Sequence, residues 1–346
     1  MSRRRNRRNN QSIRGLPRKL VTVLSVLSII IVAAVLVMSM RPRPEPSAPT
    51  AAVLSPEAVA VTSPTPAPKV GYVGGCVRQP DFVSGLGLGD QPLIGTSFRG
   101  VTGFAVVNAS TGELYQDPTW DDAGTLGAYA YDEFGDFYLG PAPFASLELN
   151  PPEKQNIIQR IDSQDGQMTP FLELPSALPP STANPFGVMG MAYDCETRSL
   201  YVSSVAGSNA TDEVGRIFRV DLNSGEIVDQ IENVDAFGVG VFNGVDGKRL
   251  YFAKARVAEL FSVGLDADGS FAGDPQQVFA TTSLPDGDNR KIRRITFDAQ
   301  NTMTLTAIDF DFTLRVASEV ENTIYTFDYD LGSGEWQLRS VERVTR

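Results

Sequence analysis

Histidine is absent from this 346-residue chain, and cysteine and tryptophan each occur only twice. The absence of histidine excludes Ser-His-Asp and Cys-His catalytic groups, and it excludes zinc or haem sites that use imidazole ligands. The sequence contains no P-loop, and no G-x-G-x-x-G motif connects a strand to a helix. Histidine-based catalysis, histidine-ligated metals and P-loop nucleotide binding are therefore excluded from the start.

The few cysteines and tryptophans also limit the chemistry. Cys76 and Cys195 form no C-x-x-C motif, so the usual geometry of thiol–disulfide catalysis is missing. In a domain outside the cytoplasm the two can form a disulfide, and two separate thiols are the alternative. Trp120 and Trp336 are single aromatic residues, for which packing is expected rather than a ligand platform.

Charge and hydrophobicity divide the N-terminal part of the chain into three zones. Residues 1–19 carry eight basic residues and no acidic residue, whereas residues 20–40 contain no charged residue, proline or glycine. The second zone matches the roughly 20 apolar residues that cross a bilayer, and its basic flank is expected to stay in the cytoplasm. Residues 41–69 are rich in Pro, Ala, Ser and Thr, which predicts a semi-rigid spacer. The sequence thus predicts a single-pass protein of the cell membrane, and a cleaved signal peptide is the alternative.

Residues 70–346, expected outside the cytoplasm, have the composition of a folded domain. They include 39 acidic and 19 basic residues, a net charge near −20. Such a charge repels nucleic acid and anionic lipid headgroups. It favours cations or basic partners, or it serves only to keep the domain soluble. Nucleic acid is therefore not expected as a partner.

A hairpin pattern recurs five times in this domain. Each copy has a β-branched or aromatic run, a polar turn with Asp, Ser or Gly, and a second run, which predicts a β-hairpin. The copies begin at Gly103, Ile157, Ile217, Leu260 and Ile324. Another hairpin precedes each copy, and in four units its small, apolar first strand ends in an aromatic residue followed by Asp or Asn. These polar residues are Asp132, Asp194, Asn243 and Asp298.

Two hairpins make one four-stranded antiparallel unit. Five such units fill the domain, at residues 81–118, 122–175, 184–233, 235–283 and 288–344. Units of this size predict an all-β fold, a β-propeller with four-stranded antiparallel blades. Five blades are favoured and six remain open. The first unit is degenerate, with a hairpin expected from Gly85, and a strand near residues 70–73 could close the ring.

The segment PFGVMGMAYDCETRSLYVSS, followed by GRIFRVDLNSGEIV, resembles the NHL, YncE-like and SMP-30-like propeller superfamily. The resemblance covers most of residues 124–343, and its motifs describe blade geometry, so it implies a fold and no particular activity. The lactonases of this superfamily bind a divalent metal through Glu, Asn and Asp at the channel mouth. Their glutamate has no match in this chain, where Asp81 is the nearest acidic residue.

One set of polar residues is expected at a mouth of the central channel, because its members precede the innermost strands. The set contains Asp81, Asp122, Asn184, Asn233, Asp235 and Asp288. Carboxylate and amide oxygens suit Ca²⁺, so Asp122, Asn184 and Asp288 are candidate metal ligands. The alternative is that these residues only form turns. Arg290 and Arg293 follow Asp288 and could bind a small anion or neutralise an acidic rim.

We expect a membrane-anchored binding module without catalysis. Its partner would be a protein, a peptide or a glycan outside the cytoplasm. One alternative is a hydrolase or lactonase that uses a calcium-type metal at the acidic channel mouth. Another is a structural scaffold of the cell envelope.

Overall fold

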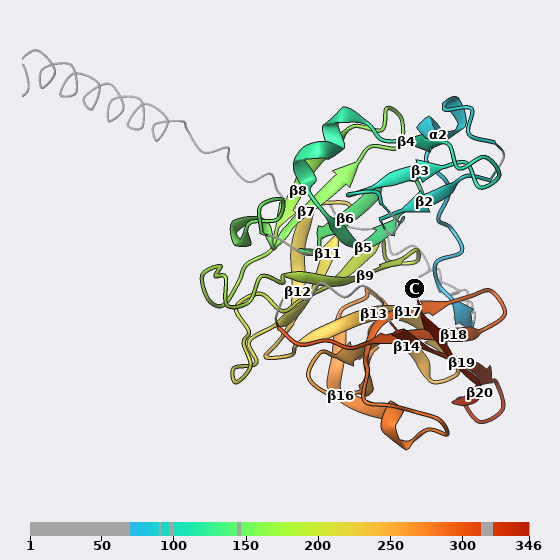
Figure 1. Cartoon of the computed structure of the whole chain (residues 1–346). Coiled ribbons are helices and arrows are strands. Elements are labelled where there is room, and N and C mark those ends of the chain that lie inside the picture. Colours follow the sequence, from blue (N-terminus) through green and yellow to red (C-terminus); the bar gives the residue numbers. More distant parts are fainter. Residues whose placement is uncertain are drawn as a thin grey trace, which may run out of the picture. The chain divides into compact units, whose positions relative to one another are not determined.

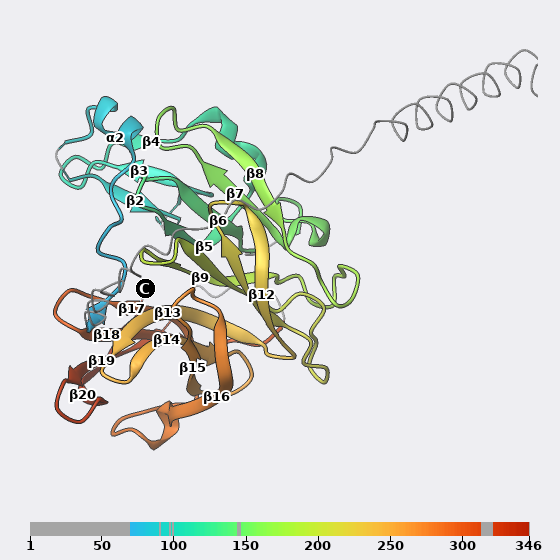
Figure 2. The same cartoon turned by 180° about the vertical axis from the view of Figure 1, so that it is seen from behind.

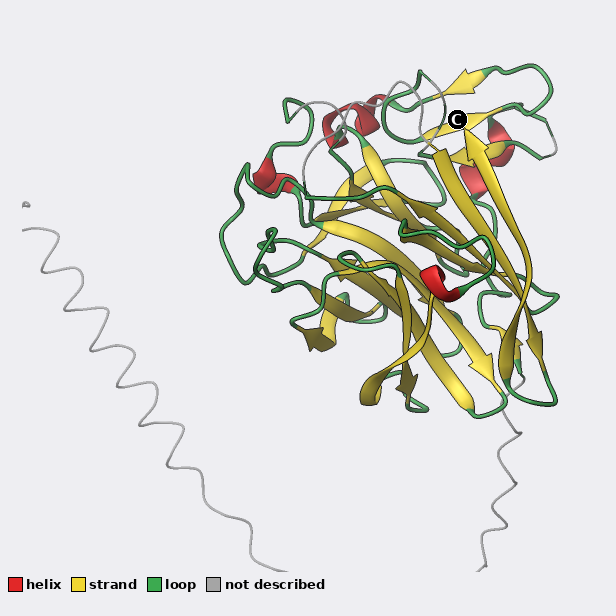
Figure 3. Cartoon of the chain, turned by 60° about the horizontal axis from the view of Figure 1, so that its bottom comes forward, coloured by secondary structure: helices red, strands yellow, loops and turns green. Residues whose placement is uncertain are grey.

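The computed structural model describes residues 70–89, 91–96, 98, 100–143, 147–312 and 321–345. The predicted basic arm, membrane span and spacer (residues 1–69) lie outside the described residues. Within the described ranges, no helix is long and apolar enough to cross a membrane. Strands account for nearly all the regular structure, and the few helices are short (Figure 3).

Five antiparallel sheets follow one another along the chain and form the blades of a β-propeller (Figure 1). Blade 1 contains β2 (Leu93–Gly95), β3 (Ala105–Val107) and β4 (Leu114–Tyr115). Blade 2 contains β5 (Leu126–Tyr131), β6 (Phe137–Pro141), β7 (Ile157–Ile161) and β8 (Met168–Glu173). Blade 3 contains β9 (Val188–Asp194), β10 (Ser199–Ser204), β11 (Arg216–Asp221) and β12 (Glu226–Glu232).

The last two blades complete the domain (Figure 2). Blade 4 contains β13 (Ala236–Gly244), β14 (Gly247–Lys254), β15 (Glu259–Leu265) and β16 (Phe271–Ala280). Blade 5 contains β17 (Lys291–Phe297), β18 (Thr302–Ile308), β19 (Glu321–Asp330) and β20 (Glu335–Thr345). The short helices are α2 (Asp81–Gly85) and the 3-10 turns η1 (Pro118–Ala123), η2 (Pro152–Lys154) and η3 (Thr281–Ser283). The prediction of five blades is confirmed.

Blade 1 departs from the four-stranded expectation. It has three described strands, and the expected hairpin from Gly85 does not form. The chain there contains α2, followed by Gly87 and Gly89 with φ angles of +70° and +88°. Left-handed backbone at two nearby positions interrupts an extended strand.

The N-terminal strand β1 (Gly71–Tyr72) joins blade 4 rather than blade 1. It pairs with the inner edge of β13, with Gly71 opposite Asn243 and Tyr72 opposite Phe242. A strand near residues 70–73 was one expectation from the sequence. Its partner lies about 170 residues downstream in the sequence, so only the tertiary structure identifies the pairing.

Turn chemistry explains the two recurring motifs. In blades 2, 3 and 5 the Asp at the end of the inner strand accepts hydrogen bonds from the following backbone, as when Asp298 Oδ1 accepts from Gln300 N and Thr302 N at 2.9 Å each. Such a turn ends the inner strand and reverses the chain. In the second hairpin of four blades the turn glycine has a positive φ between +73° and +74°. These glycines are Gly112, Gly166, Gly225 and Gly334.

The hydrophobic core lies in layers between successive blades. Phe104 of blade 1 packs against Phe137 of blade 2 at 5.0 Å between ring centroids. Phe242 of blade 4 packs against Phe297 of blade 5 at 5.1 Å. Burial of these large rings is the main favourable contribution to blade association.

The inner strands approach one another closely at matching β-bulges near their starts. The register shifts lie at residues 126–129, 188–190, 236–239 and 292–294. A Cβ atom on Gly190 would lie 2.4 Å from Phe237 O, and one on Gly238 would lie 2.9 Å from Arg293 O. Glycine at these two positions therefore allows close contact between inner strands of neighbouring blades.

Candidate functional site

The inner strands of blades 2 to 5 enclose a central cavity of about 290 Å³. Residues from β5, β9, β13 and β17 form its wall, and Tyr72 and Val77 of the N-terminal segment complete the lining. All four strands begin at the same rim because each blade starts with its inner strand. The cavity therefore lies along the propeller axis, where small-molecule sites are commonly found.

Arg293 and Arg294 of β17 both line this cavity. Regular alternation would turn neighbouring residues to opposite faces, but the bulge at residues 292–294 interrupts it. Both side chains are exposed. The Arg294 guanidinium lies 5.6 Å from the centre of the Tyr129 ring, a cation–π contact. No acidic residue occurs among the described residues of the lining.

Four tyrosines share the lining with these arginines: Tyr72, Tyr129, Tyr131 and Tyr193. Burial raises the pKa of Tyr72, and repulsion from an ionised Tyr131 adds to this. Burial and Tyr129 raise the pKa of Tyr131 in the same way. Burial, and then the hydrogen bond to Glu133, raise the pKa of Tyr193. The phenols of Tyr72, Tyr131 and Tyr193 therefore remain neutral at physiological pH.

Among the eight residues predicted at the channel mouth, Arg293 is a lining residue of this cavity, and the other seven lie outside the lining. Asp288 and Arg290 are paired in blade 5, with Arg290 Nη1 2.5 Å from Asp288 Oδ2. Thr323 Oγ1 donates to the same carboxylate oxygen at 2.5 Å. Asp288 thus connects the entry of blade 5 to its third strand.

Asp235 and Asn184 are buried and make contacts within and between blades. Asp235 accepts from Arg256 Nε at 2.6 Å and from Gly215 N at 3.1 Å. Asn184 donates to Val205 O at 2.8 Å. These bonds connect loops that precede the inner strands to the neighbouring strands, so both side chains already have protein partners.

Asp81, Asp122 and Asn233 are exposed. Asp81 begins α2, and its N–H donates to Ser163 Oγ at 3.1 Å. Lys154 Nζ donates to the backbone oxygen of Asp122 at 3.1 Å. Asn233 has a φ of +58°, a conformation that asparagine adopts readily in turns. In the described part of the chain, no three or more Asp, Glu or Cys side chains are arranged to hold a metal ion. A shared ligand set of Asp122, Asn184 and Asp288 stays a prediction.

The partners of Asp288 give a testable pH effect. Although its burial acts in the opposite direction, hydrogen bonds from Thr323 and Arg290 lower the pKa of Asp288 below 3.8. A carboxyl group whose pKa is lower in the folded state than in the unfolded state contributes stability at pH values above its unfolded-state pKa. This contribution is lost as the pH falls through the folded-state pKa. We expect Asp288→Asn to cost about 1–2 kcal/mol at neutral pH. Urea unfolding from pH 7 to pH 3 should show this difference shrinking below about pH 4, and a constant difference would contradict the assignment.

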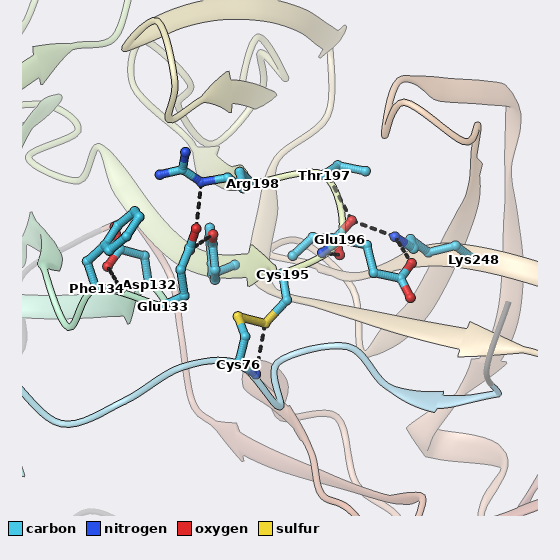
Figure 4. Close-up of a disulfide and its surroundings, with 11 residues drawn as sticks. Cys76, Asp132, Glu133, Phe134, Cys195, Glu196, Thr197, Arg198 and Lys248 are labelled. Carbon is cyan, nitrogen blue, oxygen red and sulfur yellow. Dashed lines mark hydrogen bonds and ion pairs between the residues drawn. A yellow bond between two sulfur atoms is a disulfide. The ribbon is translucent and has the colours of Figure 1, made fainter.

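The two cysteines form a disulfide between the N-terminal segment and the turn after β9 (Figure 4). Cys76 is exposed and Cys195 is half-buried. Two ion pairs flank the bond in Figure 4: Arg198 with Glu133 at 2.6 Å, and Lys248 with Glu196 at 2.6 Å. Lys248 also lies 2.8 Å from the buried Asp194 carboxylate.

Sequence reasoning missed most of the cavity. Asp and Asn before the inner strands drew attention to the rim, whereas the lining comes from within these strands. A usable signal was present, because Arg293 and Arg294 occupy positions at which the other inner strands hold only glycine, alanine, valine and methionine.

No protein-family model matches the chain, and no curated protein matches it. A luciferin-regenerating enzyme structure is 12% identical, over 74% of this chain and 79% of that one, with a TM-score of 0.38. A nidogen/laminin complex chain is 11% identical over 73% and 97%, with a TM-score of 0.39. Kuenenia stuttgartiensis hydrazine synthase is 13% identical over 70% of this chain, with a TM-score of 0.38, and this chain covers only 59% of it. These similarities are too weak to support any function, and the superfamily resemblance stays a prediction.

Proposed function

We propose that this protein is a membrane-anchored binding protein outside the cytoplasm, without catalysis, whose ligand occupies the central cavity. The observation that carries this proposal is the pair Arg293 and Arg294 in a lining that contains no described acidic residue. The surrounding domain has a net charge near −20. The positive charge of the cavity attracts a small anion, whereas the acidic surface around it repels one. The anion is therefore directed to the cavity.

The ligand we infer is a ring-bearing carboxylate, and we favour the uronate residue of a glycan. A guanidinium group binds a carboxylate through two parallel hydrogen bonds. The faces of Tyr129 and Tyr131 offer stacking surfaces for a ring, and the exposed Thr296 adds a hydroxyl group. The cavity volume of about 290 Å³ is at the low end for ligand sites and suits a single ring with its acidic group.

The membrane location rests on the apolar residues 20–40 and on the basic residues that precede them. The spacer of residues 41–69 would hold the domain away from the bilayer, where it could reach a glycan or a peptide. Carbonate extraction of membranes is a direct test. Full-length protein that is released into the soluble fraction would contradict the anchor.

Calorimetric titration of the full-length protein with glucuronate and with glucose tests the binding proposal. We expect glucuronate to bind and neutral glucose to bind much more weakly, because only glucuronate carries a carboxylate. Arg294→Ala should weaken glucuronate binding about tenfold, and Arg293→Ala/Arg294→Ala about 100-fold, because a charged hydrogen bond contributes about 1.5–3 kcal/mol.

Arg339→Ala is the matched control, since Arg339 is an exposed arginine of the same blade that pairs with Asp328 on an outer strand. It should leave binding unchanged. Equal binding of glucose and glucuronate, or an equal effect of the control variant, would contradict an anion site. Binding of benzoate but not glucuronate would show that the ligand is an aromatic acid rather than a sugar acid.

A further inference from the structure

The segment that enters the domain from the spacer crosses the propeller at the carboxyl ends of the inner strands. We call residues 70–80 the strap. It begins as β1 on blade 4, passes the turn after β9 of blade 3 and continues into α2, where Phe82 N donates to Ser163 O of blade 2 at 2.9 Å. Figure 1 shows it as the blue segment that runs between α2 and the lower blades. The strap contributes to the cavity wall from outside the four inner strands, and only its first residues, as β1, join a blade sheet.

Strap residues contribute directly to the cavity. Tyr72 and Val77 line it, and Val73 and Val77 pack against the cores between blades 3 and 4 and between blades 2 and 3. At the starts of the inner strands, Phe237 and Phe310 belong to a separate hydrophobic cluster, with 4.6 Å between their ring centroids. Met189 contacts this group and also lines the cavity. Movement of the strap would open the cavity without separating any two blades.

Apart from its disulfide, the strap is held by the pairing of β1, by the packing of Val73 and Val77, and by close contacts of Gly71 with Asn301 and of Pro80 with Gly135. Its strand β1 has only two residues, whereas the inner strands that it crosses have six to nine. Ordering a segment of this length has a large conformational-entropy cost that a two-residue strand and two valines offset only in part. The disulfide fixes Cys76 beside Cys195 and so keeps the strap near its binding surface.

We propose that the Cys76–Cys195 disulfide is a redox-sensitive restraint on the central cavity: a dithiol reductant releases the strap and speeds entry of the ligand. This regulation rests on the proposed binding function. A thiolate of the reductant attacks one sulfur of the exposed bond and forms a mixed disulfide. The second thiol of the reductant then completes the exchange. Two electrons and two protons reach Cys76 and Cys195, and the dithiol becomes a disulfide.

Two methionines of equal burial provide a test that needs no ligand. Met191 lines the cavity and Met168 lies in the core between blades 1 and 2, and both are 8% exposed. Met303 is 0% exposed and lies between blades 4 and 5. Hydrogen peroxide oxidises methionine according to its accessibility, and mass spectrometry reports each position separately.

We expect Met191 to be oxidised about fivefold faster in full-length Cys76→Ser/Cys195→Ser than in the disulfide-bonded protein. Met168 and Met303 should react at unchanged rates, because the blade cores stay closed. Trypsin should also cleave after the exposed Arg78 at least about fivefold faster in the variant. Equal acceleration at all three methionines would indicate general loosening and overturn the proposal. Unchanged rates at Met191 and Arg78 would show that the strap stays in place without the bond, which also overturns it.

Dithiothreitol treatment of the wild-type protein followed by reoxidation tests reversibility. Trypsin cleavage after Arg78 should accelerate on reduction and return to the slow rate on reoxidation. Stopped-flow measurement of glucuronate association with both forms then separates the two proposals. Strap release without any glucuronate binding would overturn the ligand proposal alone, whereas binding that is equally fast with and without the disulfide would overturn the gating role.

Discussion

Replacing Asp235 with alanine is expected to lower the free energy of unfolding by about 3–5 kcal/mol, because three donors, one of them the partly buried Arg256 guanidinium, lose a fully buried charged acceptor. Asp235 is 0% exposed, and its carboxylate lies 2.6 Å from Arg256 Nε. It also accepts from Gly215 N and from the Ser208 hydroxyl group. All three donors would lose their acceptor at once. Chemical unfolding monitored by circular dichroism measures the loss.

The stability of the Asp235→Ala variant tests whether Asp235 has a structural role, as opposed to the predicted ligand-binding role at the channel mouth. Burial raises the pKa of Asp235, which indicates that its environment is costly for a charge and is offset by these partners. Asp235→Ala/Arg256→Ala should lose less stability than the sum of the single variants, because the two groups interact directly. The exposed Asp274→Ala is the control and should change stability by no more than about 0.5 kcal/mol. Wild-type stability in Asp235→Ala would contradict the ion pair.

Trp120→Ala is expected to cost about 3–5 kcal/mol and to loosen blade 1. Trp120 is 2% exposed, and its ring contacts Phe104 at 4.9 Å and Tyr115 at 5.6 Å between centroids. Its indole N–H donates to Gly166 O at 2.8 Å. The substitution removes the largest side chain of the core between blades 1 and 2 and leaves a buried carbonyl without its donor. Hydrogen exchange should speed up in β3 while β19 of blade 5 stays protected.

Trp120→Phe is the informative companion variant. It keeps an aromatic ring in the cluster and loses the indole donor, so the expected cost is about 1–3 kcal/mol. Equal costs for the alanine and phenylalanine variants would show that the hydrogen bond, and not the packing, dominates. Loss of protection in all five blades would show that blade 1 does not unfold separately.

The hairpin repeats could be predicted because their signals are local. The turn glycines such as Gly225 and the strand-ending aspartates such as Asp298 act on their immediate neighbours, and the alternation of apolar residues reports the strands between them. The same reasoning was wrong for the inner hairpin of blade 1. There the sequence around Gly87 and Gly89 is compatible with both a strand and a loop, and a single sequence does not distinguish them. In the structure both glycines are left-handed and the segment is a loop.

The candidate site was predictable only in small part. Arg293 was proposed at the channel on the basis of its place beside Asp288, and it does line the cavity. Arg294 lines the cavity as well, because the bulge at residues 292–294 interrupts the alternation that would turn one of two neighbouring side chains away. The polar residues before the inner strands were located in sequence, but their side-chain partners lie in other strands and loops.

The sequence by itself determined the all-β class, the five hairpin repeats and the exclusion of histidine chemistry, since these depend on composition and on short-range turn preferences. It also predicts the membrane anchor. The tertiary structure alone decided that the strap pairs with blade 4, that Cys76 meets Cys195, and that arginines and tyrosines line one cavity. The physical reason is that the cavity forms where inner strands far apart in the sequence pack together, and bulges there reset which side chains point inward.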